Sequence, residues 1–340
     1  MSTRLASHCR PLESWGTAGA CAGECLGECM DRSNPICRRS ICPWQLRTRT
    51  LELGRRTLIM GVINITPDSF SDGASFLAPE AAIAHAAQLL DEGADLLDLG
   101  AESTRPGSRA GSVLGSESAP AVTAEEEQAR LLPVLQGILA AQPNAVLSID
   151  TYKAATARAA LAAGAEIIND VSGFTWDSAL PAVCAEARCG VILTHTRGRP
   201  EEWRTQPQLD PEILIATVRD GLAASLATAT NAGMAAESIV LDPGYGFGKR
   251  FNENFALLAR QHELLALRRP LLAGLSRKSF LGHALAPLYA GQPAPVNARE
   301  TASIAALVAA ILHGASIVRV HDVSPAVEAA RIADAILNAT

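Results

Sequence analysis

TLIMGVINITPDSFSDG, residues 57–73, contains the boundary between an apolar segment and a polar loop. The first eight residues are mostly apolar, as in a buried β-strand, and they end at Asn64. The rest is a loop of Ile, Thr, Pro, Asp, Ser and Gly in which Phe70 is the only aromatic residue. An apolar strand that ends in a polar side chain is the pattern that recurs along the chain.

Seven further segments follow this pattern, and Ala- and Leu-rich stretches with helical character separate them. Alternation of strands and helices is the signature of parallel βα units. Eight such strands predict an α/β protein with the fold of a (β/α)8 TIM barrel, which forms a single domain of roughly 250 residues. The further predicted strands are 94–101, 145–150, 166–171, 190–195, 238–243, 271–276 and 316–321.

Helix-boundary signals support this alternation. Thr123 with Glu126 three residues later forms a capping box, which predicts the start of a helix. The apolar segment 302–318 is short for a membrane span, so we interpret it as a buried helix that runs into a strand. Glycines mark predicted helix ends at Gly93, Gly164, Gly233 and Gly314.

Composition and charge exclude some classes of partner. The chain of 340 residues is 48% hydrophobic, which is enough for a large core. A net charge of −6 argues against nucleic-acid binding, because phosphate backbones need a basic surface. We see no N-terminal apolar core with a cleavage site, so we expect a cytoplasmic protein with no membrane partner.

The N-terminal region is rich in cysteine. Three of its cysteines are spaced four residues apart and would share one face of a helix, but this spacing matches no zinc or ferredoxin pattern. We interpret residues 1–43 as a disordered extension, or as residues upstream of a start at Met30, and residues 44–340 as the barrel. The cysteines before residue 43 are Cys9, Cys21, Cys25, Cys29, Cys37 and Cys42.

Polar residues mark the ends of all eight predicted strands. The C-terminal ends of the strands in a TIM barrel face one shared pocket, where active sites lie. A single Asp or Asn at such a position is commonly a helix cap, but eight polar ends together indicate a functional site. The residues are Asn64, Asp98, Asp150, Asn169, His195, Asp242, Ser276 with Lys278 just beyond it, and Arg319 with His321.

The chemistry of these side chains predicts a planar ligand with many N–H groups. Asp150, Asp242 and Asn169 are acceptors, and buried carboxylates are costly unless donors pair with them. Lys278 supplies a cation, and the flat guanidinium of Arg319 is able to stack on a planar ring. An amino-heterocycle would satisfy this set.

A second group of residues suits an anion. Arg105, Arg319 and His321, with oxygen donors from Asn64 and Thr104, fit a diphosphate held together with Mg²⁺. The loops after the first two predicted strands would close over a charged leaving group and exclude water. The second of these, residues 102–122, is the longest connection without an obvious helix.

Other motifs are weaker. GYGFGK, residues 244–249, has neither the spacing of a nucleotide P-loop nor that of a dinucleotide-binding loop. Backbone N–H groups near Gly246 and Gly248 could still bind phosphate, and Lys249 could equally be a solvated surface lysine. HExxH and GxSxG motifs and CxxC pairs are absent, so metalloprotease, hydrolase and thioredoxin-like activities have no support.

From Trp44 to the C-terminus, the chain resembles dihydropteroate synthases. The resemblance implies a transferase that joins 4-aminobenzoate to a dihydropterin methyl diphosphate, releasing diphosphate and forming 7,8-dihydropteroate for folate biosynthesis. It also implies a homodimer. The motifs that carry the resemblance are MGVINITPDSFSDG, DLGAESTRPG, SIDTYKA, IINDVSG, LDPGYGFGK, GLSRKSF and RVHDV.

The resemblance also assigns roles to individual residues. Diphosphate leaves before the amine attacks, and nearby carboxylates stabilise the cationic pterin methylene. Pterin binding would use Asp150, Asn169, Asp242, Lys278 and Arg319; diphosphate binding Thr104, Arg105, Arg319 and His321; aminobenzoate binding Arg105, Pro106, Phe247 and Ser276; Mg²⁺ binding Asn64; and catalysis Asp98, Lys278 and Arg319.

Two features depart from the family pattern. The family usually has Met before the histidine of the fifth strand, and this chain has Thr194, so pterin affinity or ring orientation would differ. The loop after STRPG is longer than usual by about ten residues, which affects how Arg105 reaches the site.

Two other functions fit the same features. A pterin-binding methyltransferase would present Asp and Asn to the ring, but STRPG and SRKS serve a diphosphate and a carboxylate that methyl transfer does not need. A catalytically idle paralogue would bind pterin without turnover. Replacing Asp98 by Asn separates a synthase from a binder, since only the synthase loses an activity.

Overall fold

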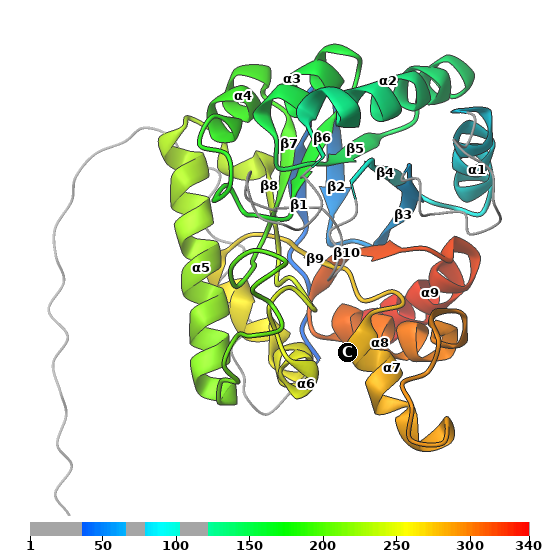
Figure 1. Ribbon diagram of the computed structural model, residues 1–340, viewed down its shortest axis with the longest axis vertical. Helices are drawn as coiled ribbons and strands as arrows, with labels where there is room; N and C mark the ends of the chain where they lie inside the picture. Colours follow the sequence, from blue (N-terminus) through cyan, green and yellow to red (C-terminus); the bar gives the residue numbers. More distant parts are fainter. Residues whose placement is uncertain (1–35, 66–78, 103–121, 340) are drawn as a thin grey trace, which may run out of the picture.

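The computed structural model describes residues 36–65, 79–102 and 122–339. Eight parallel strands form a closed barrel in the order β10-β3-β4-β5-β6-β7-β8-β9, and helices surround it (Figure 1). This confirms the predicted (β/α)8 TIM barrel. The strands are β3 (Leu58–Asn64), β4 (Leu96–Gly100), β5 (Leu147–Asp150), β6 (Ile167–Asp170), β7 (Gly190–Thr194), β8 (Ile239–Asp242), β9 (Leu271–Ala273) and β10 (Ala315–Val320).

The helices follow the strands as predicted. Thr123 Oγ1 accepts a hydrogen bond from Glu126 N at 3.2 Å, and Glu126 Oε2 accepts one from Thr123 N at 3.1 Å, so the capping box is confirmed. The four predicted glycines follow helix ends with positive φ. The helices are α1 (Pro79–Asp91), α2 (Ala124–Ala141), α3 (Ala154–Ala162), α4 (Leu180–Ala187), α5 (Pro211–Asn231), α6 (Phe251–Ala259), α7 (Ser279–Ala284), α8 (Glu300–Leu312) and α9 (Val323–Ala339), and the short 3-10 helices are η2 (Ala236–Ser238), η3 (Gln261–Leu267), η4 (Ala286–Leu288) and η5 (Val296–Ala298).

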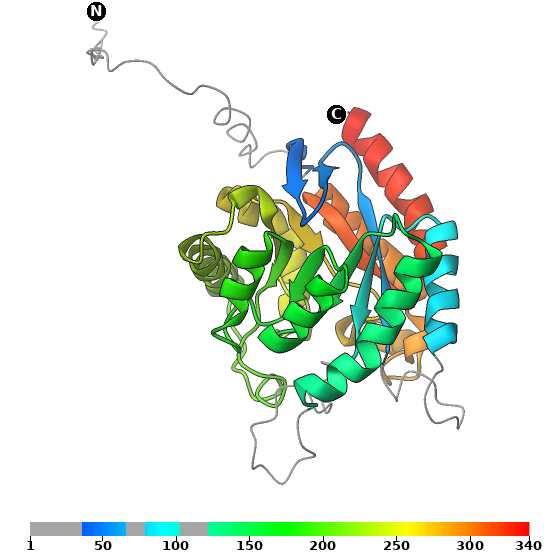
Figure 2. The same cartoon turned by 90° about the horizontal axis from the view of Figure 1, so that it is seen from above.

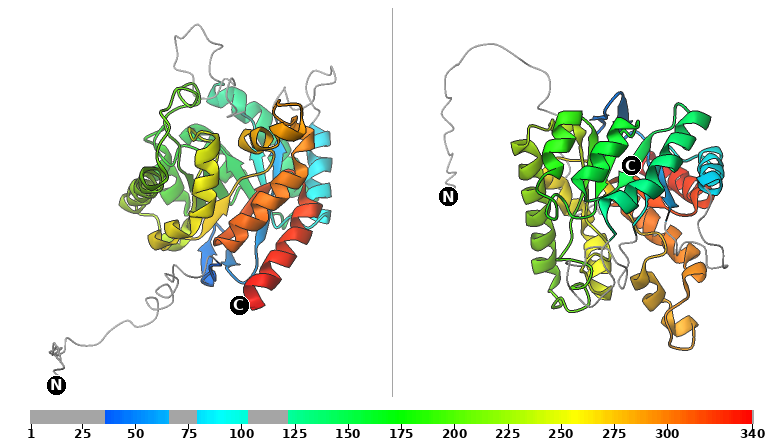
Figure 3. Two further views of the ribbon diagram at one scale, coloured as in Figure 1. Left: turned by 90° about the horizontal axis from the view of Figure 1, so that it is seen from below. Right: turned by 45° about the horizontal axis from the view of Figure 1, so that its top comes forward.

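A β-hairpin, which the sequence did not predict, closes the N-terminal end of the barrel. It consists of β1 (Cys42–Gln45) and β2 (Thr50–Leu53), and it lies beside the C-terminal end of α9 (Figures 2 and 3). Trp44 is fully buried, and its indole Nε1 donates to Ser238 O at 3.0 Å. Its ring packs with Leu53 and with apolar residues near the strand starts, among them Leu58 and Leu96.

The segment before the hairpin contacts the start of the first barrel strand and the start of the last. Arg39 Nη1 donates to Thr57 Oγ1 at 2.7 Å and to Ala315 O at 3.0 Å, and its Nη2 pairs with Asp334 Oδ1 at 2.6 Å. These partners precede β3, begin β10 and lie in α9, so Arg39 joins the first and last barrel strands. The predicted boundary between residues 43 and 44 lies inside β1.

Two described cysteines of the N-terminal group, Cys37 and Cys42, are free thiols, and Cys37 is buried. The other four lie outside the described residues, as does the predicted extension before residue 36. The segment predicted as a buried helix entering a strand is α8 followed by β10. Within the described ranges, α5 is long and apolar enough to cross a membrane, but it packs Leu214, Val218 and Leu222 against the barrel.

Candidate active site

The predicted polar side chains gather where the strands end. Asp150 pairs in register with Asn169 across β5 and β6, and Asp242 pairs with Thr194 across β8 and β7. Asp98 lies one strand before Asp150, and Arg319 lies on β10. Parallel strands in a closed barrel bring residues from distant parts of the chain to one mouth, which is where TIM-barrel enzymes carry their chemistry.

Asp98 is the central carboxylate of this mouth. It is fully buried and accepts three hydrogen bonds: from Ser148 Oγ at 2.6 Å, Arg319 Nε at 2.6 Å and Asn169 Nδ2 at 3.0 Å. Because three donors fix both oxygens, the carboxylate keeps one orientation and its charge is partly compensated. Ser148, on β5, escaped sequence prediction because it lies inside an apolar strand.

Arg319 connects two carboxylates. Its Nε binds Asp98, and its Nη2 lies 3.0 Å from Asp150 Oδ2. Burial raises the pKa of Asp150 to about 7, although Arg319 opposes this shift, and the neighbouring Asp98 adds to it. Burial alone would lower the pKa of Arg319, but the two carboxylates raise it overall, so the guanidinium stays charged. When both carboxylates are ionised, the trio has a net negative charge.

The opposite side of the mouth combines Asp242 with an aromatic wall. Asp242 Oδ1 accepts a hydrogen bond from Gly244 N at 2.7 Å. Burial raises the pKa of Asp242, and this hydrogen bond and nearby cations, including Lys278, oppose that shift. Lys278 Nζ lies 4.1 Å from the centre of the Phe247 ring, which packs edge-on against Trp203 with centroids 5.0 Å apart. Trp203 lies in a loop and matched no sequence pattern.

The turn after β9 brings Ser276 to His321. The imidazole Nδ1 lies 3.0 Å from Ser276 Oγ, which also accepts from His321 N at 3.3 Å. Next in the turn, Arg277 has a left-handed backbone, with φ of 58°, which is unfavourable for a side chain of this size. Asp322 holds its guanidinium at 2.5 and 3.1 Å, and Ser303 Oγ accepts from its N–H at 2.9 Å.

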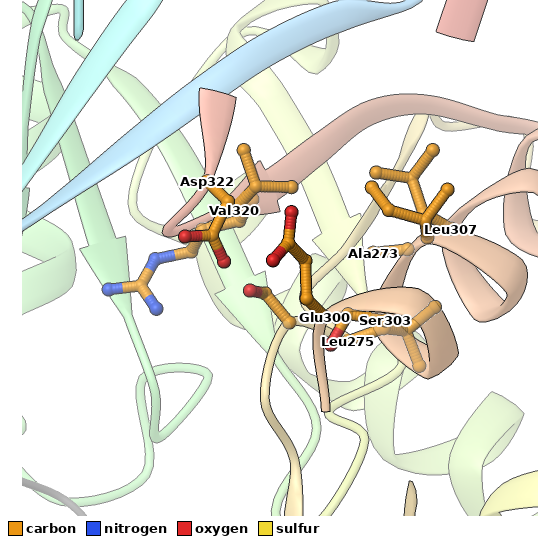
Figure 4. Close-up of a pocket in the computed structure, with 10 residues that line it drawn as sticks. Ala273, Leu275, Glu300, Ser303, Leu307, Val320 and Asp322 are labelled. Carbon is orange, nitrogen blue, oxygen red and sulfur yellow. The ribbon is translucent and has the colours of Figure 1, made fainter. Parts of the chain in front are cut away.

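A small cavity lies behind this turn, between β9, β10 and α8. In Figure 4, Glu300 and Asp322 flank it on one side, and Leu307 with Ala273 on another. Its volume of about 10 Å³ accommodates at most one water molecule. We therefore assign it to the support of the turn and not to substrate binding.

One predicted residue, His195, differs from the expectation, and three others lie outside the described residues. His195 is buried with its ring against Gly221 of α5, where a Cβ would lie 2.5 Å from the imidazole, so the ring packs outside the strands. Burial lowers its pKa well below the ordinary value, which keeps it neutral. Thr104, Arg105 and Pro106, the loop with Phe70, and the extra length after STRPG lie outside the described residues.

Two residues of the loop GYGFGK, Lys249 and Gly246, differ from their sequence interpretations. Lys249 is buried, so it is not a solvated surface lysine. The Gly246 N–H donates to Asn254 Oδ1 at 2.7 Å, so it is not available to cradle a phosphate. Thr194 is also buried, at the end of β7 beside Gly244.

Fold and site together define a barrel enzyme whose mouth carries buried carboxylates, an arginine and an aromatic wall suited to a planar heterocycle. A family model described as pterin binding enzyme matches residues 60–321.

The chain belongs to the dihydropteroate synthase family, whose enzymes are transferases of folate biosynthesis. The dihydropteroate synthase of Mycobacterium leprae is 42% identical over 283 residues, which cover 83% of this chain and 94% of that protein. A structure of the Xanthomonas albilineans enzyme with 4-aminobenzoic acid is 38% identical, with a TM-score of 0.74 over 87% of this chain and 98% of that one. Another structure from that organism, with 7,8-dihydropteroate, is 35% identical, with a TM-score of 0.71 over 86% and 98%.

Proposed function

We propose that the mouth of this barrel joins 4-aminobenzoate to (7,8-dihydropterin-6-yl)methyl diphosphate, forming 7,8-dihydropteroate and diphosphate. The observation that carries the proposal is the trio of Asp98, Arg319 and Asp150 at the barrel mouth. When both carboxylates are ionised, this partly buried group is net negative and favours a reaction in which positive charge develops on the substrate.

The pterin ring is proposed to bind between the two sides of the mouth. Asp150, Asn169 and Asp242 accept hydrogen bonds from its N–H groups, which offsets the cost of burying these carboxylates. Lys278 binds a ring acceptor, and the guanidinium of Arg319 stacks on the ring face. A pterin presents donors along one edge, as this arrangement requires.

The chemical step is proposed to begin with loss of diphosphate. The bond between the methylene carbon and the diphosphate oxygen breaks, and the electron pair leaves with the oxygen. Asp98, held by Ser148 and Asn169, stabilises the cation that remains. The amine of aminobenzoate then forms the C–N bond, and the proton that it loses passes to solvent. Lys278 and Arg319 are proposed to act as cationic catalytic groups in the mouth.

The leaving group is proposed to meet His321 and Arg319, together with Thr104 and Arg105. Asn64 ends β3 at the mouth and offers an amide oxygen for Mg²⁺. Residues 36–65, 79–102 and 122–339 contain no group of three His, Cys, Asp or Glu that could hold a metal. This fits Mg²⁺, which keeps several waters and binds substrate phosphates with few protein ligands. When bound, the ion neutralises charge on the departing diphosphate.

Aminobenzoate is proposed to lie against Phe247, with its carboxylate near Ser276 and with Arg105 and Pro106 completing the site. Phe247 is fixed between Trp203 and Lys278, so it offers a rigid aromatic face.

We also propose a cytoplasmic homodimer. Phe251 and Phe255 of α6 are exposed, and so are Leu288, Tyr289 and Val296 after α7. The packing of Phe255 on Phe280, with centroids 5.1 Å apart, places α6 beside α7. Exposed apolar groups on adjacent elements are typical of a protein interface. Analytical ultracentrifugation of Leu288→Glu against the unchanged chain tests this, and an unchanged sedimentation coefficient would contradict the assignment.

The reaction is tested by diphosphate release from dihydropterin methyl diphosphate and Mg²⁺, with and without 4-aminobenzoate. We expect release and dihydropteroate only when both substrates are present. Tight pterin binding without a product that depends on aminobenzoate would indicate a binding protein. Methyl transfer from a methylated folate to a corrinoid would indicate the methyltransferase alternative.

A further inference from the structure

Lys249 is a buried lysine whose three acceptors are all backbone carbonyls. Its Nζ donates to Gly244 O at 2.8 Å, His195 O at 3.0 Å and Phe247 O at 3.3 Å. Burial lowers the pKa of Lys249 well below its ordinary value, and Asp242 opposes this. A neutral amine donates only two N–H bonds, so three carbonyl acceptors favour the ammonium.

These carbonyls come from two loops that meet closely. His195 follows β7, and Gly244 and Phe247 lie in the loop after β8. Gly244 has φ of 71°, and a Cβ there would lie 2.0 Å from His195 O, so the two backbones approach within a distance that only glycine allows. Three converging carbonyl dipoles repel one another, and the ammonium offsets that repulsion.

The residues fixed in this way are those proposed to bind both substrates. Gly244, whose carbonyl Lys249 binds, donates its own N–H to Asp242 Oδ1 at 2.7 Å. Phe247, whose carbonyl is also bound, carries the ring that faces Lys278. Lys249 therefore acts on the pterin side and on the aminobenzoate side without reaching either substrate.

We propose that Lys249 is a positioning residue for both substrate sites: its buried ammonium joins the loop after β7 to the loop after β8 and thereby sets the positions of Asp242 and Phe247. This rests on the proposed function of the mouth. Asn254 also contacts this loop through Gly246, and the Arg197 guanidinium, from the loop after β7, donates to Gly248 O at 3.2 Å. The ammonium of Lys249 is the cation that binds the carbonyls of Gly244 and Phe247.

The charge of Lys249 also affects the ionisation of Asp242. The charged and titratable groups that face Asp242 are Lys249 and Tyr245 from its own loop, Lys278 from the turn after β9 and Arg319 from β10. Burial raises the pKa of Asp242, and the three cations oppose this. Loss of the Lys249 charge raises the pKa of Asp242 further. Because pterin binding needs the ionised carboxylate, acidification then abolishes pterin binding at a higher pH.

Two variants separate position from charge. Lys249→Met removes the donors and the charge while keeping an unbranched side chain. Lys249→Gln removes the charge but keeps an amide donor on a shorter polar side chain, so it is the more conservative change for folding. Asp334→Asn is the matched control, because it weakens a buried ionic contact at the opposite end of the barrel. Steady-state kinetics with both substrates, a pH profile of pterin binding and thermal unfolding are measured for each.

We expect Lys249→Met to raise KM for both substrates, with kcat/KM lower by about 10- to 100-fold. Lys249→Gln should bring the aminobenzoate KM most of the way back to its normal value. It should still lose pterin binding at a higher pH than the unchanged chain, because the charge is absent. Asp334→Asn should lower only the unfolding temperature. The proposal is overturned if either Lys249 variant lowers the unfolding temperature with both KM values and the pH profile unchanged. Absence of turnover in the unchanged chain would instead contradict the proposed function.

Discussion

The two ends of the barrel are built from the same strands but carry opposite chemistry. At the N-terminal end, Trp44 and Leu53 of the hairpin pack on apolar strand starts such as Leu96. Towards the C-terminal end, two residues further along β4, Asp98 is equally buried but makes hydrogen bonds to three side chains.

This contrast shows how one strand serves stability and function. The closed end gains free energy from apolar burial, whereas the mouth holds charged groups whose desolvation is costly. Changes at the closed end should therefore affect unfolding, and changes at the mouth should affect turnover.

The largest effect on turnover is expected from Asp98→Asn. The variant keeps the shape of the side chain but removes the charge that stabilises the pterin cation, so kcat should fall by about 10³- to 10⁴-fold. The matched control is Asp95→Asn, before the same strand, which loses contacts to Arg56 and to Ile59 N. If Asp98→Asn turned over at the normal rate, the role of Asp98 would be wrong.

The largest effect on stability is expected from Trp44→Ala. Removal of a fully buried indole should lower the free energy of unfolding by about 3–5 kcal/mol, as measured by urea denaturation. The folded fraction should keep its kcat and both KM values. A large fall in kcat without loss of stability would contradict the assignment of stability to the closed end and turnover to the mouth.

Pterin affinity should rise with pH through the pKa of Asp150. Because that pKa is about 7, the carboxylate gains its charge between pH 6 and 8, and the affinity should rise by about tenfold. The same raised pKa means that the folded state favours the protonated form of Asp150. The contribution of Asp150 to the free energy of unfolding therefore falls as pH rises from the ordinary pKa of an aspartate to about 7. Titration calorimetry should show a flatter pH profile for Asp150→Asn; an identical profile would assign the titration to another group.

The smallest effect is expected from Asp322→Asn. This change weakens the contact that holds Arg277 in its left-handed conformation and so loosens the turn that carries Ser276. The ion pair is partly exposed, so we expect a cost of about 1 kcal/mol, seen as a roughly fivefold rise in the aminobenzoate KM. The pterin KM serves as the internal control, and an equal rise in both would point to a general loss of structure.

Sequence reasoning predicted the eight strands because each is a continuous apolar run with a polar end. The barrel then required Asp98, Asp150, Asn169, Asp242 and Arg319 to meet, and they do. The hairpin was missed, because two four-residue strands in a segment rich in Cys and Arg have no periodic signal. The role of Trp44 in closing the N-terminal end of the barrel depends on its contacts with the strand starts, which are known only from the folded structure.

Other site residues depend on tertiary contacts that spacing does not encode. His195 ends a predicted strand, but its ring packs against α5 instead of pointing into the mouth. Ser148 and Trp203 contact site residues, yet one lies in an apolar strand and the other in a loop. Lys249 is buried because the two loops beside it converge, which no local pattern predicts.

Arg39 has a consequence for how the chain folds during synthesis. Its partner Thr57 is synthesised long before its other two partners, Ala315 and Asp334. The strand pairing of β3 with β10 has the same constraint. A nascent chain therefore presents β3 with one open edge until β10 has been synthesised, so its exposure to aggregation is set by the rate of translation as well as by the stability of the finished barrel.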